Sequence, residues 1–375
     1  MDWMDQSDAH EQGLLCHGGS GTSYGPHHVN GTQLAEPISL PDVNFRVFEN
    51  ARVSATSSSV ILNDKKVLIE RVLDSDQRKF NYAGGQIFLH WSKIAVVRLG
   101  SAEKVKKGIF LGGNGSFNYY HWVVEILPKF QFIHSLPSPY SNYPLLISED
   151  IERISTFKET LGLFMSDCEV IVLKKDRSYV IGNLVYIDSP SNLPFNLRKK
   201  ERFNISYSHI SGDSLKYIRK VALAKINNYT HQDVVITKRI FLCRMNKRRR
   251  YNENDVFKCL AVYGFKKVYM EDLSFEEQVA VIHQAEWIVG PTGAAWTNLI
   301  FCQPGAKCLC WMAEEYGEFS AYSTIARLVG ADLRYILYKT GARSTGELYG
   351  KDYTLDVSMI VMWLRDLGEA VTDNT

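Results

Sequence analysis

The sequence has no long hydrophobic run and no recognisable targeting segment. None of its apolar stretches approaches the roughly 18 consecutive apolar residues that a membrane-spanning helix needs. The first residues, MDWMDQSDAHEQ, show neither the basic region nor the apolar region of a signal peptide. We therefore expect a cytoplasmic protein without a transmembrane helix.

The sequence also lacks a cysteine framework and a strong net charge. Its 7 cysteines include no Cys-x-x-Cys pair, which argues against a zinc ribbon or a disulfide scaffold. Lys and Arg (43) nearly balance Asp and Glu (41). The overall charge of +2 therefore gives no sign of a nucleic-acid or membrane partner, and we expect no nucleic acid among the partners. The 45% of hydrophobic residues are typical of a globular chain, and 375 residues predict about two domains at roughly 150 residues each.

The hydrophobic pattern divides the chain into four parts. Residues 1–40 are rich in Gly, His, Ser and Pro and are expected to form a loose arm. Residues 41–220 begin with a β-rich segment and continue, from Gly108, with strands that alternate with helices. The alternation is clearest in residues 221–340. An amphipathic helix in residues 341–375 is expected to pack back on the N-terminal half.

Five apolar runs in residues 221–340 predict a parallel sheet. They read KRIFLCR, FKKVYME, EWIVG, AKCLCWM and ADLRYILY, and four helical patterns separate them. This order is typical of a doubly wound α/β fold. With the alternation in the first half, it predicts two Rossmann-like domains that face a central cleft.

A run of cations follows the first of these predicted strands. Between positions 238 and 250 there are seven basic residues and no acidic one: Lys238, Arg239, Arg244, Lys247, Arg248, Arg249 and Arg250. Guanidinium groups at a strand end before a helix start suit phosphate oxygens. A solvated basic loop and an RNA-binding surface are the alternatives, although no RNP-like, KH-like or zinc motif accompanies the run.

The loop after EWIVG offers a second anion-binding candidate. Gly293, followed by Ala294 at a helix start, allows a ligand to approach the backbone closely, and Thr292 is a candidate N-cap. A pyrophosphate fits such a helix N-terminus. A tight strand-to-helix turn with small residues for packing explains the same pattern.

In the first half, His121 and Glu125 are spaced i, i+4 and share one helix face. A histidine beside a carboxylate is a reasonable general base. A buried core histidine is the alternative, and a metal site would need a third ligand that the sequence does not show. Pro128 is expected to break or kink the same helix.

Three segments together resemble glycosyltransferase family 61. They are NYYHWVVEILPKF, RMNKRRRYNE and LSFEEQVAVIHQAEWIVGPTGAAWTNLIFCQPGAKCLCW, and the resemblance covers roughly Val47–Leu337. It implies an inverting, nucleotide-sugar-dependent transferase of the GT-B fold, with UDP-sugars as typical donors.

The resemblance also assigns residues. It places the phosphate-contacting arginines on Arg244 and Arg248, and the family's His-Trp, Glu and Leu-Pro on His121, Trp122, Glu125 and Pro128. The Asn-Glu pair, the helix-start glycine and the downstream Asn fall on Asn252, Glu253, Gly293 and Asn298. Many members carry His-Gly-Ala where this chain has Thr292-Gly293-Ala294. The role of that histidine is therefore either lost or taken by the Thr292 hydroxyl.

On this resemblance we expect a metal-independent single displacement. A UDP-sugar binds to residues 221–340, and His121 or Glu125 deprotonates a hydroxyl of a glycan acceptor bound to the N-terminal half. The expected setting is capsule or cell-surface polysaccharide synthesis, where a lipid-linked acceptor would bring the enzyme to the inner face of the cytoplasmic membrane. The alternative is a non-catalytic nucleotide-sugar-binding protein. Donor sugar, linkage and oligomeric state stay open.

Overall fold

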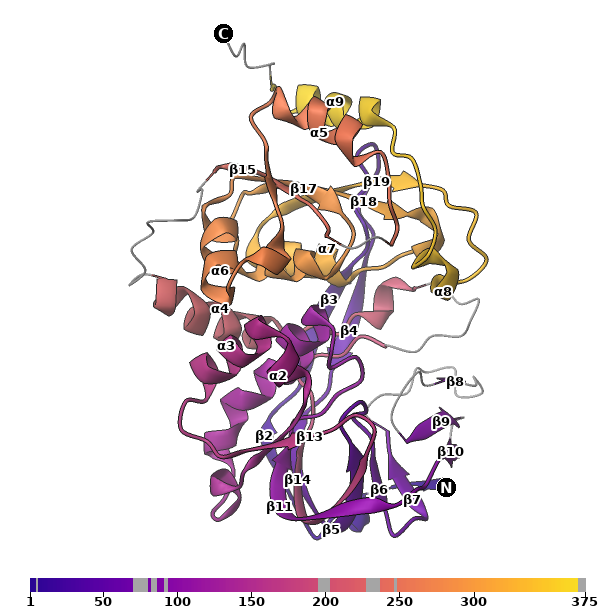
Figure 1. Ribbon diagram of the computed structural model, residues 1–375, viewed down its shortest axis with the longest axis vertical. Helices are drawn as coiled ribbons and strands as arrows, with labels where there is room; N and C mark the ends of the chain where they lie inside the picture. Colours follow the sequence, from indigo (N-terminus) through magenta and orange to yellow (C-terminus); the bar gives the residue numbers. More distant parts are fainter. Residues whose placement is uncertain are drawn as a thin grey trace. The chain divides into compact units, whose positions relative to one another are not determined.

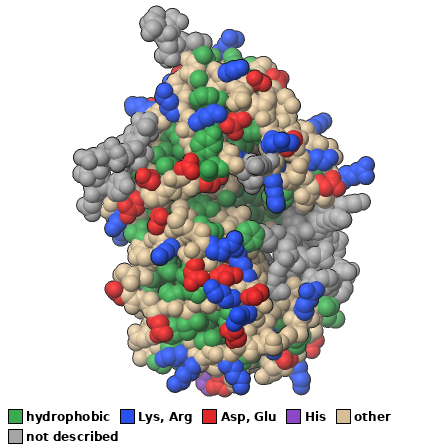
Figure 2. Space-filling view, in the orientation of Figure 1, with side chains coloured by type: hydrophobic (Ala, Val, Ile, Leu, Met, Phe, Trp, Pro, Cys, Tyr) green, Lys and Arg blue, Asp and Glu red, His purple; other side chains and the backbone are tan. Residues whose placement is uncertain are grey.

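A computed structural model divides the chain into two compact units (Figure 1). It describes residues 1–4, 6–69, 80–81, 86–90, 94–194, 203–226, 237–245 and 248–369. Unit 1 comprises Met1–Gly21, Pro37–Arg198 and His209–Val221, and unit 2 comprises Thr22–Glu36, Lys199–Ser208 and Ala222–Thr375. On the face that Figure 2 shows, basic and acidic side chains are interspersed, in keeping with the net charge of +2.

Unit 2 is built on a five-stranded parallel sheet with the order β16-β15-β17-β18-β19. All five predicted strands are confirmed, because strands buried on both faces need continuous apolar runs. Figure 1 shows α5 and α9 on one face of this sheet and α6 and α7 on the other. The strands are β15 (Arg239–Leu242), β16 (Lys266–Val268), β17 (Trp287–Pro291), β18 (Lys307–Ala313) and β19 (Asp332–Tyr338).

The helices of unit 2 follow the strands in the predicted alternation. Helix α6 begins with a capping box, in which the Ser274 hydroxyl accepts from the Glu277 N–H and the Glu277 carboxylate accepts from the Ser274 N–H. The helices are η5 (Ile205–Tyr207), α5 (Glu253–Ala261), η6 (Met270–Asp272), α6 (Phe275–Gln284), η7 (Ala294–Phe301), η8 (Glu314–Tyr316), α7 (Ala321–Val329), α8 (Thr345–Leu348) and α9 (Val357–Asp366).

Helix α9 packs on unit 2 itself, whereas the sequence analysis expected residues 341–375 to pack on the N-terminal half. The indole of Trp363 on α9 meets that of Trp287 on β17 edge to face, with ring centroids 5.4 Å apart. Arg239 at the start of β15 pairs with Glu369 just beyond α9, at 2.6 Å. The apolar stripe of this helix therefore covers the face of the parallel sheet that also carries α5 (Figure 1).

The described strands of unit 1 form a nine-stranded mixed sheet with the order β1-β7-β6-β5-β14-β11-β12-β13, in which β2 also pairs with β5. The strands of a separate three-stranded sheet, β10-β9-β8, lie between β7 and β11 in the sequence. The bounds are β1 (Asp2–Trp3), β2 (Glu11–Cys16), β5 (Val43–Ser54), β6 (Val60–Leu62), β7 (Lys66–Leu68), β8 (Phe80–Asn81), β9 (Ile87–His90), β10 (Ala95–Val97), β11 (Ala102–Phe110), β12 (Leu145–Ser148), β13 (Val170–Leu173) and β14 (Ser178–Ile187).

This sheet corrects the predicted fold class of two Rossmann-like, doubly wound domains of the GT-B type. Strand β14 pairs with β11 in parallel and with β5 antiparallel, from Ser178↔Ser54 to Ile187↔Phe45. The predicted β-rich segment and the predicted strand–helix alternation thus share one mixed sheet. A local hydrophobic pattern identifies strands but does not say which distant strand each one pairs with.

The remaining helices lie mostly in unit 1. They are η1 (Gln6–Asp8), α1 (Tyr119–His121), η2 (Trp122–Ile126), η3 (Leu127–Ser135), η4 (Tyr140–Asn142), α2 (Asp150–Arg153), α3 (Ser155–Phe164) and α4 (Gly212–Ile226). Across the described ranges, no helix has the length and apolar character needed to cross a membrane.

Residues 1–40, expected to form a loose arm, contain ordered strands. Besides β1 and β2 they hold the hairpin of β3 (Gly19–Tyr24) and β4 (Ala35–Leu40). Between its strands, the His27 carbonyl accepts from the Tyr335 N–H at 2.8 Å, and the Val29 N–H donates to the Tyr335 carbonyl at 3.2 Å. This segment therefore extends the β19 edge of the unit 2 sheet. Its composition of Gly, His and Ser concealed this pairing.

Candidate functional site

The strand order of unit 2 places two of the predicted loops side by side. In the order β16-β15-β17, the chain leaves β15 toward one side of the sheet and later returns on the other side. Ligands of open α/β sheets bind at the carboxyl ends of strands where the order reverses in this way. Arg244 follows β15, and Gly293 follows β17.

The guanidinium of Arg244 lies directly against Gly293. A Cβ atom at Gly293 would stand 3.0 Å from Nη2 of Arg244, so only glycine leaves this space free. Nη2 is buried and has no hydrogen-bond partner in the described part of the chain. Burial, and then the charge of Arg249, lower the pKa of Arg244 below its usual value. An unpartnered buried cation is costly, and an anionic ligand would offset that cost.

Arg249 belongs to the predicted run of cations, although the family resemblance did not select it as a site residue. Its Nη1 donates to the Tyr316 hydroxyl at 3.4 Å, and its guanidinium lies 5.3 Å from the centre of the Tyr349 ring. Its backbone is left-handed (φ 54), which is uncommon for a residue other than glycine. Arg248, which the resemblance selected, is exposed on the same loop.

Contacts of the next residue, Arg250, hold this left-handed turn. The Arg250 N–H and guanidinium donate to Asp352 at 2.8–3.0 Å, and the Tyr353 N–H donates to the Arg250 carbonyl at 3.0 Å. The turn directs Arg249 toward Arg244 and leaves Arg248 at the surface. Within a run of consecutive arginines, no local pattern reveals which side chain turns inward.

Stacked tyrosines surround the two arginines. The rings of Tyr338 and Tyr353 are stacked 3.7 Å apart, and Tyr251 stacks on Tyr353 at 5.2 Å. Burial raises the pKa of each of these phenols, so they remain neutral. A neutral aromatic wall lowers the local dielectric and strengthens the attraction between the arginines and an anion.

Other predicted residues of unit 2 have structural partners. Asn252 binds the Leu355 backbone with both amide atoms, at 2.9 and 3.1 Å, and Glu253 pairs with Lys267 at 3.0 Å. Asn298 is fully buried and donates to Gln278 at 3.1 Å. These contacts connect α5 and η7 to their neighbours, so these residues support the fold of the site.

Thr292 and Ala294 flank Gly293 at the end of β17. The Thr292 N–H donates to the Trp311 carbonyl at 2.8 Å, and the Thr292 hydroxyl forms a hydrogen bond with the Cys310 thiol. Ala294 opens η7, where no side chain caps the first turn. The first N–H groups of a helix have no acceptor within the helix. The start of η7 therefore presents backbone donors beside Arg244.

In unit 1, His121 and Glu125 form the predicted pair. His121 Nδ1 lies 2.7 Å from Glu125 Oε2, and both residues are buried. The other carboxylate oxygen, Oε1, accepts from the Leu193 N–H at 2.6 Å. Because both oxygens of Glu125 are engaged, this residue is suited to orient the His121 ring rather than to take a proton itself.

The segment that carries this pair is interrupted, as Pro128 predicts. Three α-helical residues are followed by the π-helical turn η2, in which the Leu127 N–H donates to the Trp122 carbonyl, and then by the 3-10 helix η3. Pro128 has no N–H to continue the α-helical ladder. π-Helical turns are frequent at functional sites. The sequence pattern did not predict this π-helical turn.

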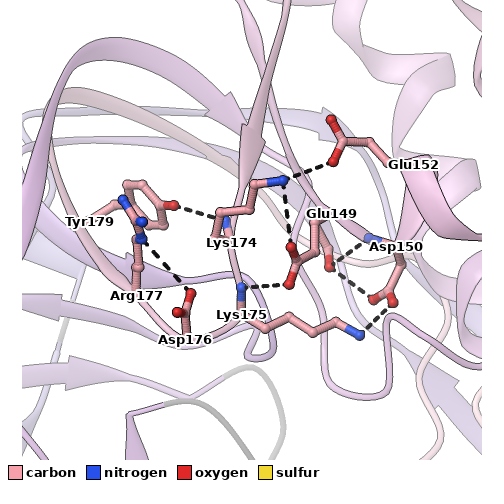
Figure 3. Close-up of polar contacts among 9 residues, drawn as sticks. Glu149, Asp150, Glu152, Lys174, Lys175, Asp176, Arg177 and Tyr179 are labelled. Carbon is pink, nitrogen blue, oxygen red and sulfur yellow. Dashed lines mark hydrogen bonds and ion pairs between the residues drawn. The ribbon is translucent and has the colours of Figure 1, made fainter.

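A second polar network lies at the ends of β12 and β13. Figure 3 shows Lys175 between Glu149 and Asp150, and the Lys175 Nζ lies 2.5 Å from Asp150 Oδ1. The buried Asp150 also accepts from Ser148 at 2.9 Å and from Ser116 at 3.3 Å. Asp150 thereby anchors the loop that leads from β11 into the helix of His121. Within the described ranges, no three His, Cys, Asp or Glu side chains are grouped to hold a metal ion.

The buried, unpartnered Nη2 of Arg244 lies at a switch point of a parallel sheet, where open α/β sheets commonly bind their ligands. The family model Glycosyltransferase 61 matches residues 119–309, about half of the chain. The chain therefore belongs to glycosyltransferase family 61, and the resemblance seen in the sequence is confirmed. Membership assigns it to the glycosyltransferases. A comparison with curated proteins gave no match.

Proposed function

We propose that unit 2 binds a nucleotide-sugar through its pyrophosphate. The observation that carries this proposal is the buried, unpartnered Nη2 of Arg244 against Gly293. Arg249 supplies a second cation, and the start of η7 supplies backbone N–H donors. Two guanidinium groups and a helix start suit the two phosphates of a nucleoside diphosphate.

The reaction that we propose is a single displacement with inversion. The acceptor oxygen forms a bond to the anomeric carbon, and the bond from that carbon to the diphosphate oxygen breaks with its electron pair. Arg244 and Arg249 would offset the charge that develops on the leaving diphosphate. Because these cations are fixed in place, we expect the transfer to need no metal ion.

For unit 1 we propose His121 as the base that receives the acceptor proton. A neutral imidazole that donates its Nδ1–H to Glu125 carries its lone pair on Nε2. The Leu193 N–H fixes the second oxygen of Glu125, so the carboxylate holds the ring in this tautomer. This arrangement favours His121 over Glu125 as the base and makes Glu125 a positioning residue.

The finer assignments follow the family resemblance. We propose a UDP-sugar as donor and a hydroxyl of a capsule or cell-surface polysaccharide as acceptor. A lipid-linked acceptor would bring the enzyme to the cytoplasmic face of the membrane. These assignments concern the ligands, so a substrate panel tests them separately from the site residues.

A turnover assay with UDP-, GDP- and CMP-sugars tests the proposal. We expect the wild type to release one nucleotide with transfer of its sugar to a glycan or to water, and Arg244→Met to lose about 100-fold in kcat/KM. Arg365→Met, which changes an exposed arginine on α9, is the matched control and should retain full activity. Nucleotide binding without any turnover would favour a non-catalytic sugar-nucleotide-binding protein instead.

A further inference from the structure

Glu315, like Arg244, is a charged residue of unit 2 with a buried side-chain atom that has no hydrogen-bond partner among the described residues. It lies in η8, directly after β18, and its Oε1 accepts three hydrogen bonds. The donors are the Thr340 N–H at 2.8 Å, the Thr340 hydroxyl at 2.9 Å and the Gly341 N–H at 2.7 Å. Gly341 has a left-handed backbone (φ 69), which turns its N–H toward the carboxylate.

The other oxygen of Glu315 has no such partner. Oε2 is buried and accepts no hydrogen bond from the residues that the structure describes. Burial acts to raise the pKa of this carboxyl, but hydrogen bonds from its own backbone N–H, from Thr340 and from Gly341 lower it overall. The group is therefore held as a carboxylate with one oxygen saturated. A buried carboxylate oxygen without a donor is costly unless a ligand supplies one.

Glu315 belongs to the same edge of the sheet as the two arginines. Strand β18 runs parallel to β17, its neighbour, so the carboxyl ends of both strands point the same way. The next residue, Tyr316, accepts from Arg249. Glu314 differs sharply, because its side chain is 45% exposed and pairs with Lys339 at 3.6 Å.

We propose that Glu315 Oε2 accepts a hydrogen bond from a ribose hydroxyl of the nucleotide whose phosphates Arg244 and Arg249 bind. The inference rests on the proposed function and names a specificity-determining residue for it. A carboxylate repels phosphate, so its ligand partner must be a donor elsewhere in the same molecule. In a nucleoside diphosphate the ribose diol is the donor group nearest to the phosphates.

Titration calorimetry with ribose and deoxyribose ligands tests the inference. The ligands are UDP and GDP, their 2′-deoxy and 3′-deoxy analogues, and inorganic pyrophosphate. Of UDP and GDP, we expect the wild type to bind the tighter ligand about 10-fold more tightly, or better, than at least one of that ligand's deoxy analogues. Glu315→Ala should remove this difference and leave the affinity for pyrophosphate unchanged. Glu314→Ala is the matched control and should keep the difference.

Glu315→Gln provides a second variant of the same shape. Loss of the charge should reduce the ribose preference, because charge-assisted hydrogen bonds are roughly twice as strong as neutral ones. The inference would be overturned if both Glu315 variants kept the full ribose preference, or if they weakened pyrophosphate as much as the nucleotides. A wild type that bound neither nucleotides nor pyrophosphate would instead overturn the proposed function.

Discussion

Arg244 and Gly293 lie far apart in the sequence but meet in the structure. Sequence patterns selected both as candidates, because a strand end with arginines and a glycine at a helix start each suit phosphate. The patterns could not show that Arg249, and not Arg248, turns toward Arg244. That choice depends on the left-handed turn that Asp352 holds, far along the chain. Nor could the patterns show that the side chain of Asn298 is buried in the fold.

The buried Nη2 of Arg244 predicts that the residue favours ligand binding at a cost in stability. Arg244→Met keeps an unbranched apolar side chain and removes the guanidinium with its unpartnered nitrogen. We expect the ligand-free protein to gain about 1–3 kcal/mol of unfolding free energy. Urea denaturation measures this change. A loss of stability would mean that Arg244 has a structural role.

Gly293→Ala tests the close approach of the arginine. The new Cβ would stand 3.0 Å from Nη2, so the guanidinium would have to shift. We expect nucleotide affinity to fall about 10-fold, an effect of about 1.4 kcal/mol. Gly162→Ala on α3 is the control, because nothing lies within 4 Å of its Cβ position. The control should leave affinity unchanged and stabilise the helix by about 0.5–1 kcal/mol.

At the scale of single elements, the sequence predicted which segments form helices and strands better than it predicted their local geometry. The spacing of Ser274 and Glu277 in the sequence is typical of a capping box, and the structure has this box at the start of α6. Pro128 indicated an interruption, but the π-helical turn depends on tertiary packing. There, the Trp122 indole donates to Thr160 at 2.8 Å and stacks on Phe157 at 4.8 Å. Long-range contacts of this kind leave no periodic signal.

The capping box makes a quantitative prediction for α6. Ser274→Ala removes the acceptor for the Glu277 N–H at the helix start. We expect a loss of about 1 kcal/mol in the unfolding free energy. Guanidinium denaturation of the variant and the wild type measures it. Ser274→Asp, which preserves an acceptor at the N-cap, should stay close to the wild type, and equal losses in both variants would contradict the capping role.

At the scale of the whole molecule, local patterns predicted the strands but not the topology of unit 1. The unit 2 sheet joins strands that are near in sequence, so alternation was sufficient to predict it. In unit 1, β5 and β14 pair across more than a hundred residues of chain. Segments around Ser23 and Ile205 also belong to unit 2, although they lie far from it in sequence.

Ser23 connects these separate segments. Its hydroxyl is fully buried, donates to the Ile205 carbonyl at 2.6 Å and lies 3.0 Å from the Ser320 hydroxyl. Ser23→Ala removes one hydrogen-bond partner from the Ile205 carbonyl and one from the Ser320 hydroxyl. We expect the free energy of unfolding to fall by about 1–3 kcal/mol. Thermal and urea unfolding measure it. A change within about 0.5 kcal/mol would show that the segments are joined by other contacts.

We propose that Arg244 and Arg249 hold the diphosphate of a nucleotide. Calorimetric titration of UDP and GDP into the wild type, Arg244→Met, Arg249→Met and Arg248→Met tests this assignment. We expect binding by the wild type, a loss of about 100-fold in affinity for the first two variants, and a much smaller effect for the exposed Arg248. Unchanged affinity in Arg244→Met, or a larger loss in Arg248→Met than in Arg249→Met, would contradict it.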